Sequence, residues 1–323
     1  MSAKMTLALA HDSKTDPVRA AAFVKLVSDM PLTYKPRPLV GVNIGWGGVG
    51  AGHEEATSDG EAAFSAALLY WATGNQVYAD LACAVVRAWA TTNTSWKGDN
   101  AILEASWSVC SMARAAELLK WSPAKAKWMQ VEPLFYHWLD AVIMPVLKSE
   151  VIWGWPIVGN WHFSQICARM QLAILREDMK EWEWCTKRYL VALPKGLLCK
   201  MCPGQVSETT RDVTHSAFEI GGMTQAAEMA HHQGLDLYDP RLIDACELQA
   251  TLLMKTIPPG LTKDDIHTPY GYFYEPVLEL PFTHFNGRLR LAMPKCAQLL
   301  SMVRPERVTF HWGAGTLTHY GRT

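Results

Sequence analysis

The sequence predicts an all-α protein, an (α/α) toroid or incomplete barrel, and three observations support this prediction. Apolar side chains recur at helical spacing in segments of about 12–25 residues, strand-like alternation is scarce, and the connecting turns are short and polar. Short turns place consecutive helices side by side and antiparallel. About ten such helices, each apolar on a broad face, favour helices paired around a ring, with a ligand cleft where the long loops gather.

Local signals mark where the helices begin and end. Asp16 followed by proline is an N-cap, and it predicts a helix that runs towards Met30. Ser58 and Glu61 have the spacing of a capping box before an apolar run that stops at Gly74. Further helices are expected at residues 76–92, 101–120, 123–147, 161–176, 179–193, 208–233 and 240–254.

The glycine-rich segment 40–52 lies between these helical patterns and reads as a loop. No linker rich in proline or serine and no break in composition divides the chain, of which 49 % is hydrophobic. We therefore expect residues 1–323 to form a single domain.

Charge and hydropathy limit the expected partners. Lys and Arg total 30 and Asp and Glu total 31, so the chain offers no general field for nucleic acid or an anionic membrane. No apolar run reaches the roughly 18–20 residues of a spanning helix. The first residues lack the pattern of a signal peptide. We expect a cytoplasmic protein or one from which a signal has been removed.

Metal ligands are not expected. Eight cysteines lie mostly in apolar stretches, and the pair Cys199 and Cys202 has no second pair to complete a zinc site. Buried thiols, with at most one loop disulfide, account for them. His231 and His232 are adjacent, and on a regular helix they point about 100° apart, so they do not bind one ion together.

The segment 208–218 carries the first candidate site. On a helix, Arg211 and His215 would share one face, with Glu208 and Phe218 extending it. A guanidinium beside an imidazole can neutralise a carboxylate and handle a proton. The structural alternative is a salt-bridge pattern on a helix surface with a packed histidine.

Asn160 is a second candidate, because it stands where a helix is expected to begin. It is either an ordinary N-cap or an amide that faces an anion together with the helix N-terminus. A loop with Trp46 and His53 is either a flap over a polymer or a turn-rich edge. Fourteen tryptophans suit core packing or stacking on sugar rings.

The third candidate is near the C-terminus. Tyr270, Tyr272 and Tyr274 precede His284 and Arg288, and tyrosine beside histidine and arginine suits acid–base work on a sugar. Taken singly, each of these residues is more often a packed side chain.

Together these segments resemble the alginate lyase domain family of (α/α)-toroid polysaccharide lyases, and more closely its alginate/glucuronan lyase branch. The matching stretches keep their order from about residue 40 to the end. They are SDGEAAFSAALLYWATGNQVYADLACAVVRAW, GNWHFSQICARMQLAI, GQVSETTRDVTHSAFEIGGMTQAAEMAHHQGLDLY, THFNGRLRLAMP and HWGAGTLTH.

The resemblance implies a secreted lyase that cleaves an anionic polymer of uronic acid, alginate or glucuronan, by β-elimination without a cofactor. Carried over by motif, Asn160 and Arg211 neutralise the uronate carboxylate, and His215 acts as base or neutraliser. The implied catalytic residues are Asn160, Arg211, His215, Tyr272, Tyr274 and His284. The implied substrate-binding residues are Trp46, His53, Trp155, Trp161, His162, Glu208, Phe218, Phe285 and Arg288.

The sequence departs from the family at two positions. Where relatives often carry tyrosine, this chain has Phe218 and Phe285, and phenylalanine cannot transfer a proton. The acid is then expected among Tyr270, Tyr272 and Tyr274, or the chain has lost lyase activity.

Two other classes of protein compete with the lyase. A toroidal glycoside hydrolase would need two carboxylates about 5–10 Å apart, for which Glu104, Glu208 and Asp212 are candidates. A sugar-binding protein on an inactive lyase scaffold is the alternative that is not an enzyme.

Overall fold

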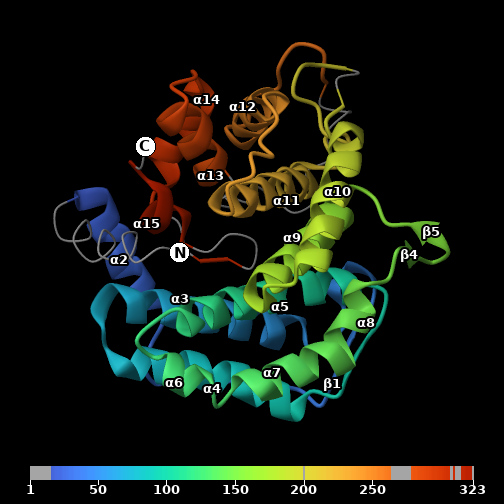
Figure 1. Ribbon diagram of the computed structural model, residues 1–323. Coiled ribbons are helices and arrows are strands. Elements are labelled where there is room, and N and C mark those ends of the chain that lie inside the picture. The colour runs from blue at the N-terminus through green and yellow to red at the C-terminus, as the bar shows by residue number, and fades with distance from the viewer. Residues whose placement is uncertain (1–15, 199–200, 263–277, 306–307, 310–313, 322–323) are drawn as a thin grey trace. The chain divides into compact units, whose positions relative to one another are not determined.

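The computed structural model describes residues 16–198, 201–262, 278–305, 308–309 and 314–321. These residues are mostly helical, as predicted, with a few short strands (Figure 1). They group into two compact units. Unit 1 falls within Met1–Ile157 and Ala168–Trp182, and unit 2 within Val158–Cys167 and Glu183–Thr323. The expectation of a single domain stays a prediction.

Unit 1 combines helices with short strands. Its helices are α2 (Pro17–Asp29), α3 (His53–Thr73), α4 (Gln76–Thr92), α5 (Ala101–Lys120), α6 (Lys125–Trp128), α7 (Glu132–Trp138) and α8 (Met144–Leu147), with a 3-10 turn η1 (Trp46–Gly48) and a π-helical turn η2 (Leu139–Ile143). Its strands are β1 (Gly41–Ile44), β2 (Gly50–Ala51), β3 (Ser95–Lys97), β4 (Val151–Ile152) and β5 (Trp155–Pro156).

Unit 2 is helical in its described part. Two helices belong to both units, since α9 (Gly159–Arg176) starts in unit 2 and α10 (Met179–Gly196) starts in unit 1. The remaining elements are α11 (Val213–His232), α12 (Arg241–Leu253), α13 (Glu279–Phe282), a π-helical turn η5 (Thr283–Arg288), α14 (Pro294–Val303) and α15 (Gly315–His319).

Several predicted helix ends are confirmed. The Asp16 side chain accepts hydrogen bonds from the backbone N–H groups of Val18 and Arg19 at the start of α2. Gly74, with a φ of 70°, ends α3 in the left-handed conformation that glycine adopts without strain. Asn75 caps α4.

Other boundaries differ from the prediction. The capping box is wrong, because α3 already begins at His53 and both Ser58 and Glu61 lie inside the helix. The expected helix 123–147 is divided into α6, α7, η2 and α8. The glycine-rich segment 40–52 is not only loop, since β1 pairs antiparallel with β2 and parallel with β3.

The core of unit 1 forms where α3 packs against α4 and α5. Gly60 lets α3 approach α5 closely, because a Cβ at this position would lie 2.6 Å from the carbonyl oxygen of Ser108. Trp89, Trp96 and Trp138 pack on one another beside these helices. All three are buried, so each adds to the hydrophobic stabilisation of this unit.

In unit 2, the start of α9 packs against the middle of α11. A Cβ at Gly222 of α11 would lie 2.5 Å from the Cβ of Phe163, so glycine permits this contact. The buried thiol of Cys167 donates to the carbonyl oxygen of Gly222. These contacts fix the N-terminal turn of α9 beside α11, and that turn carries Asn160.

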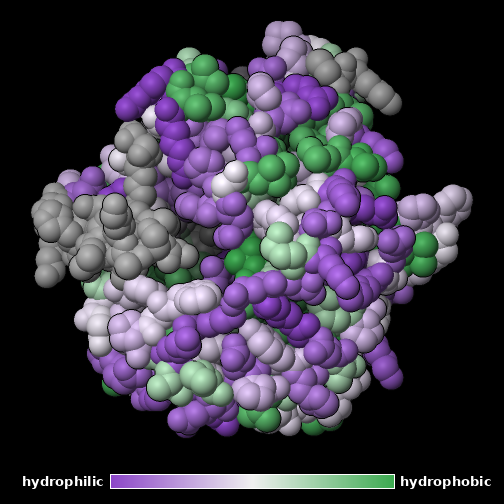
Figure 2. Space-filling model, viewed as in Figure 1, coloured by the Kyte–Doolittle hydropathy of each residue, from purple (hydrophilic) through white to green (hydrophobic). Residues whose placement is uncertain are grey.

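The described cysteines behave as expected for core thiols. All seven are buried: Cys83, Cys110, Cys167, Cys185, Cys202, Cys246 and Cys296. Cys199 lies outside the described residues. No described helix is long and apolar enough to cross a membrane. On the face that Figure 2 shows, hydrophilic side chains cover most of the surface and hydrophobic ones gather in separate patches.

Candidate active site

The N-terminus of α11 is built around Asp212. Its carboxylate accepts a hydrogen bond from the backbone N–H of His215 at 2.7 Å, which makes it the N-cap of the helix. The prediction that Arg211 and His215 lie four residues apart on one helical face is therefore wrong. Arg211 precedes the helix, because the cap at Asp212 starts the helix at Val213.

Asp212 also binds the imidazole of His215, with 2.6 Å between its Oδ2 and Nδ1 of the ring. Burial alone would raise the pKa of Asp212, but the hydrogen bonds from His215 and the charge of Arg211 lower it. The ionised carboxylate holds the proton of His215 on Nδ1. Nε2 is then the basic nitrogen of the ring, as a general base requires.

Glu208 links Asn160 and Arg211, the two residues predicted to neutralise the uronate carboxylate. Its Oε1 accepts from Nδ2 of Asn160 at 2.8 Å, and its Oε2 lies 3.5 Å from a terminal nitrogen of Arg211. The close approach depends on Gly159, which has a φ of 59° and whose Cβ, if present, would lie 2.6 Å from Oε1.

Asn160 and Arg211 differ in exposure. Asn160 is fully buried in the first turn of α9, and its Oδ1 has no hydrogen-bond partner among the described residues. The Arg211 side chain is 42 % exposed, and its Nε lies 3.9 Å from Oδ2 of Asp212. The structure thus brings Asn160, Glu208, Arg211, Asp212 and His215 into one connected polar network within unit 2.

Glu219 of α11 supports this network and was missed by the sequence reasoning. It accepts from the hydroxyl of Ser207 at 2.6 Å and from the backbone N–H of Glu208 at 3.0 Å. Burial raises its pKa to about 8. An acidic residue in an otherwise apolar helical run was the signal that could have identified it.

Aromatic rings lie beside the network. The ring of Phe218 meets that of His215 edge to face, with centroids 5.7 Å apart. His162 accepts a hydrogen bond from Nε of Arg188 at 3.2 Å. Trp161 precedes it in the first turn of α9.

The C-terminal candidates lie in a second cluster of unit 2. His284 stacks on Tyr238 with ring centroids 3.7 Å apart. Burial, followed by the charge of Arg288, lowers the pKa of His284 to about 4, so the imidazole is neutral at physiological pH. Phe285 is 1 % exposed and packs edge to face on both of these rings, so packing accounts for its place here.

Arg288 forms two hydrogen bonds with the buried carboxylate of Glu228, at 2.6 and 3.0 Å. The hydroxyl of Tyr238 donates to the same carboxylate at 2.8 Å. Burial opposes ionisation of Glu228, but His232, His319 and Arg288 together hold its pKa well below the usual range. Sequence reasoning placed Arg288 on the substrate and missed Glu228.

The remaining sugar-contact candidates lie in unit 1. Trp46 and Trp153 are both more than half exposed, with ring centroids 5.0 Å apart, and Trp155 is 74 % exposed. His53 is paired with the buried Glu104, with 2.6 Å between Nδ1 and Oε2. Trp153 was missed, although it stands two residues before Trp155. Tyr270, Tyr272 and Tyr274 lie outside the described residues.

A family model described as alginate lyase matches residues 51–250. No curated protein matches the sequence. Among solved structures, alginate lyase A1-III from Sphingomonas species A1 is similar at 16 % identity, with a TM-score of 0.68 and coverage of 98 % of this chain and 94 % of that one.

Two further solved structures are similar. A tyrosine-to-phenylalanine variant of alginate lyase A1-III complexed with a tetrasaccharide gives 18 % identity and a TM-score of 0.72, over 98 % of this chain and 94 % of that one. An alginate lyase from Bacteroides ovatus gives 13 % and 0.66, over 99 % of this chain and 98 % of that one. At such identities the likeness shows the fold, and it confirms the predicted all-α, (α/α)-toroid class.

The family match is evidence from the sequence itself, in addition to the likeness in fold. It includes Asn160, Glu208, Arg211, Asp212 and His215, the residues of the connected network. Because the matched segment makes up more than half of the sequence, the chain belongs to the alginate lyase family.

Proposed function

We propose that this polysaccharide lyase cleaves a polymer of uronic acid, alginate or glucuronan, at the network of Asn160, Arg211 and His215. The observation that carries the proposal is a shared oxygen. Oδ2 of Asp212 lies 2.6 Å from Nδ1 of His215 and 3.9 Å from Nε of Arg211. A base and a cation are thereby held beside each other, which β-elimination next to a carboxylate requires.

Arg211 is suited to hold the carboxylate of the reacting uronate, while the buried Asn160 donates to Glu208 beside it. A guanidinium has five N–H donors, and the contacts of Arg211 with Glu208 and Asp212, at 3.5 and 3.9 Å, are loose. Since its side chain is 42 % exposed, a substrate carboxylate can bind there in competition with Glu208. Fixed donors at that carboxylate stabilise the negative charge that develops when the C5 proton leaves.

His215 then acts as the base. Its Nε2 takes the proton from C5, the electron pair forms the C4–C5 double bond, and the bond from C4 to the bridging O4 breaks. O4 receives a proton, and the product carries an unsaturated uronate at its new end. Asp212 orients the ring and stabilises the imidazolium that forms.

The acid that protonates O4 is assigned by sequence to Tyr272 or Tyr274. A neutral tyrosine has a pKa of about 10 and can donate the proton, which neither Phe218 nor Phe285 can. Replacing both tyrosines with phenylalanine should abolish turnover while leaving binding of the polymer intact. Full activity in that double variant would leave His215 or His284 as the donor.

The substrate is an anionic polysaccharide in this proposal, and neither nucleic acid nor a membrane is a partner. The near-equal numbers of acidic and basic residues support this, because such a balance creates no general attraction for polyanions. Recognition of the polymer then rests on local groups such as Arg211. We infer that the protein acts outside the cell, where such polymers occur as structural material.

The test is a panel of substrates. Polymannuronate, polyguluronate, glucuronan and a neutral glucan are incubated with the protein, and ultraviolet absorbance of the unsaturated uronate is followed together with new reducing ends. Absorbance and reducing ends should rise together on one of the uronates. Reducing ends without absorbance would identify a hydrolase, and binding without either would identify an inactive binding protein.

A further inference from the structure

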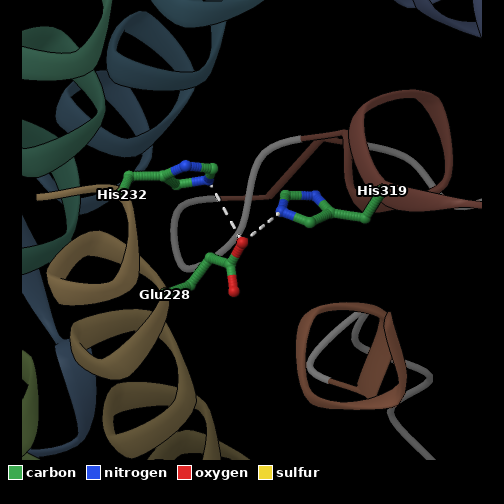
Figure 3. Close-up of side chains that lie close together, drawn as sticks. All are labelled: Glu228, His232 and His319. Carbon is green, nitrogen blue, oxygen red and sulfur yellow. Dashed lines mark ion pairs between the residues drawn. The ribbon is translucent and has the colours of Figure 1, made fainter. Parts of the chain in front are cut away.

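A second cluster in unit 2 gathers side chains that ligate metals. Glu228 and His232 belong to α11 and His319 to α15, and both imidazoles point at the same carboxylate oxygen (Figure 3). Nε2 of His232 lies 3.1 Å and Nε2 of His319 lies 3.3 Å from Oε1 of Glu228. One potential ligand atom from each residue falls within 4.8 Å of the others.

The arrangement has the features of a zinc site. Two imidazoles and a carboxylate are a common set of three protein ligands for Zn²⁺. Glu228 and His232 are four residues apart on a helix, so they share one face, and the third ligand comes from a distant element. With ligand bonds of about 2.0–2.2 Å in a tetrahedron, neighbouring ligand atoms lie roughly 3.3 Å apart, close to the two distances found here.

The proton on His319 gives independent support. The Thr318 hydroxyl donates to the carbonyl oxygen of Ala314 at 2.8 Å, and its oxygen lies 2.7 Å from Nδ1 of His319. A carbonyl can only accept, so Nδ1 of His319 carries the proton and donates to the threonine oxygen. A neutral His319 therefore has a lone pair on Nε2.

That lone pair faces a carboxylate, which also offers only lone pairs. Nε2 of His319 is buried and makes no hydrogen bond of acceptable geometry among the described residues, despite its 3.3 Å distance from Glu228. Two acceptors at this distance repel each other unless a cation lies between them. The cation is either a proton on His319 or a metal ion bound by all three side chains.

Glu228 retains room for a metal. Its Oε2 accepts from Arg288 and Tyr238. Among the described residues, its Oε1 accepts one hydrogen bond, from Arg288, and otherwise faces the two imidazoles. A carboxylate oxygen has two lone pairs, so Oε1 can bind an ion with the second. Arg288 and Tyr238 would then orient the ligand from behind.

We propose that Glu228, His232 and His319 bind one divalent transition-metal ion of the Zn²⁺ class. The ion joins α11 to α15 and leaves a fourth position for water or an anion. Since Arg288 offsets the charge of Glu228, the ion keeps its double charge, which favours an anionic fourth ligand. The site is independent of the proposed lyase chemistry.

The test uses Co²⁺ as a spectroscopic substitute for Zn²⁺. The full chain is treated with a chelator, dialysed and titrated with Co²⁺, and both the visible absorption and the metal bound per chain are measured. We expect one Co²⁺ per chain, with the intense visible bands of a tetrahedral ion and no thiolate charge-transfer band, because the ligands are nitrogen and oxygen. Zn²⁺ should displace the colour.

Variants assign the ligands. His232→Ala and His319→Ala should each bind at least tenfold less Co²⁺ at the same free concentration. His231→Ala is the matched control, since His231 neighbours His232 but faces His284, and it should bind as the wild type does. Zn²⁺ should raise Tm in the wild type and in His231→Ala only.

Two results would overturn the proposal. One is a folded wild-type protein that takes up no stoichiometric metal. The other is equal uptake by the wild type and His232→Ala, a change at a side chain that is 42 % exposed and compatible with folding. The first result would show that no ion binds to this cluster, and the second would show that the bound metal does not depend on His232.

Discussion

Asp212 binds His215 twice, once through the backbone N–H at 2.7 Å and once through the imidazole Nδ1 at 2.6 Å. The first bond starts helix α11, and the second fixes which nitrogen of the ring is basic. One carboxylate therefore serves both folding and the proposed chemistry, and substitutions can separate the two roles.

Asp212→Asn should separate them. Asparagine is as good an N-cap as aspartate, so the free energy of unfolding should change by less than about 1 kcal/mol. The amide cannot stabilise the imidazolium or hold the same tautomer, so kcat should fall by about a hundredfold or more. Denaturant unfolding and lyase assays of the variant measure the two effects. Unchanged kcat would remove His215 from the role of base.

Asp212→Ala is the companion variant. It removes the cap as well, and it should lower the free energy of unfolding by about 1 kcal/mol relative to Asp212→Asn. Equal stability of the two variants would show that the cap contributes little.

Arg211→Ala should lower kcat/KM by roughly a hundredfold or more, because it removes a donor to the carboxylate on which charge develops. The matched control is Arg241→Ala, since Arg241 is also an exposed arginine of unit 2 paired with an aspartate, Asp239. It should leave kcat/KM within about twofold. Similar mild losses in both variants would make Arg211 a structural residue only.

Phe218→Tyr and Phe285→Tyr should behave differently. Phe218 is half-buried beside His215, so a hydroxyl there can reach the network and should raise turnover if the chain as it stands is slow. Phe285 is 1 % exposed and packs on the rings of Tyr238 and His284, so an added hydroxyl must displace its neighbours and should destabilise the protein by about 1–3 kcal/mol. Activity and Tm of both variants check this, and a stabilised Phe285→Tyr would be the contrary result.

Glu219 should make stability fall as pH rises. Burial raises its pKa from 4.5 to about 8, so between these values the folded protein holds a proton that the unfolded chain releases. The free energy of unfolding should therefore decrease from about pH 4.5 to about pH 8, by at most about 5 kcal/mol.

Glu219→Gln should flatten that pH dependence. Glutamine resembles the protonated acid, because its oxygen can accept from the backbone of Glu208 while its amide donates to Ser207. Unfolding curves across this pH range compare the variant with the wild type. An unchanged slope would assign the dependence to another group.

Local sequence patterns predicted a helix well where residues next to the helix itself set its ends. Residues 101–120 form α5 as expected, and Asp16 and Asn75 cap their helices. The error at Arg211 came from extending an apolar pattern through Asp212, although aspartate before an apolar run is itself a start signal. The spacing of apolar residues alone does not show whether the helix begins at Glu208 or after Asp212.

Part of the candidate site was predictable because its residues lie in motifs that resemble the family. Family motifs point to Asn160, Arg211 and His215, and the structure links these three residues through Glu208 and Asp212 in unit 2. Glu228 was missed because its partner Arg288 is 60 residues away in sequence, and no periodic pattern connects the two. The adjacent positions of His231 and His232 predict no shared metal ion, and they do not indicate that His232 pairs with Glu228, four positions before it.

Helix α11 begins at the Asp212 cap and carries Glu228 and His232 in its last turns. It is a continuous rod of 20 residues, about 30 Å long at 1.5 Å per residue. Inserting or deleting one residue in its middle would rotate one end by about 100° relative to the other. Glu228 would then turn away from Arg288 while Asp212 kept its own contacts. The side chains of the helix can therefore vary, but its length cannot. Relatives that keep both the Asp212 cap and Glu228 should show no insertion or deletion between these two residues.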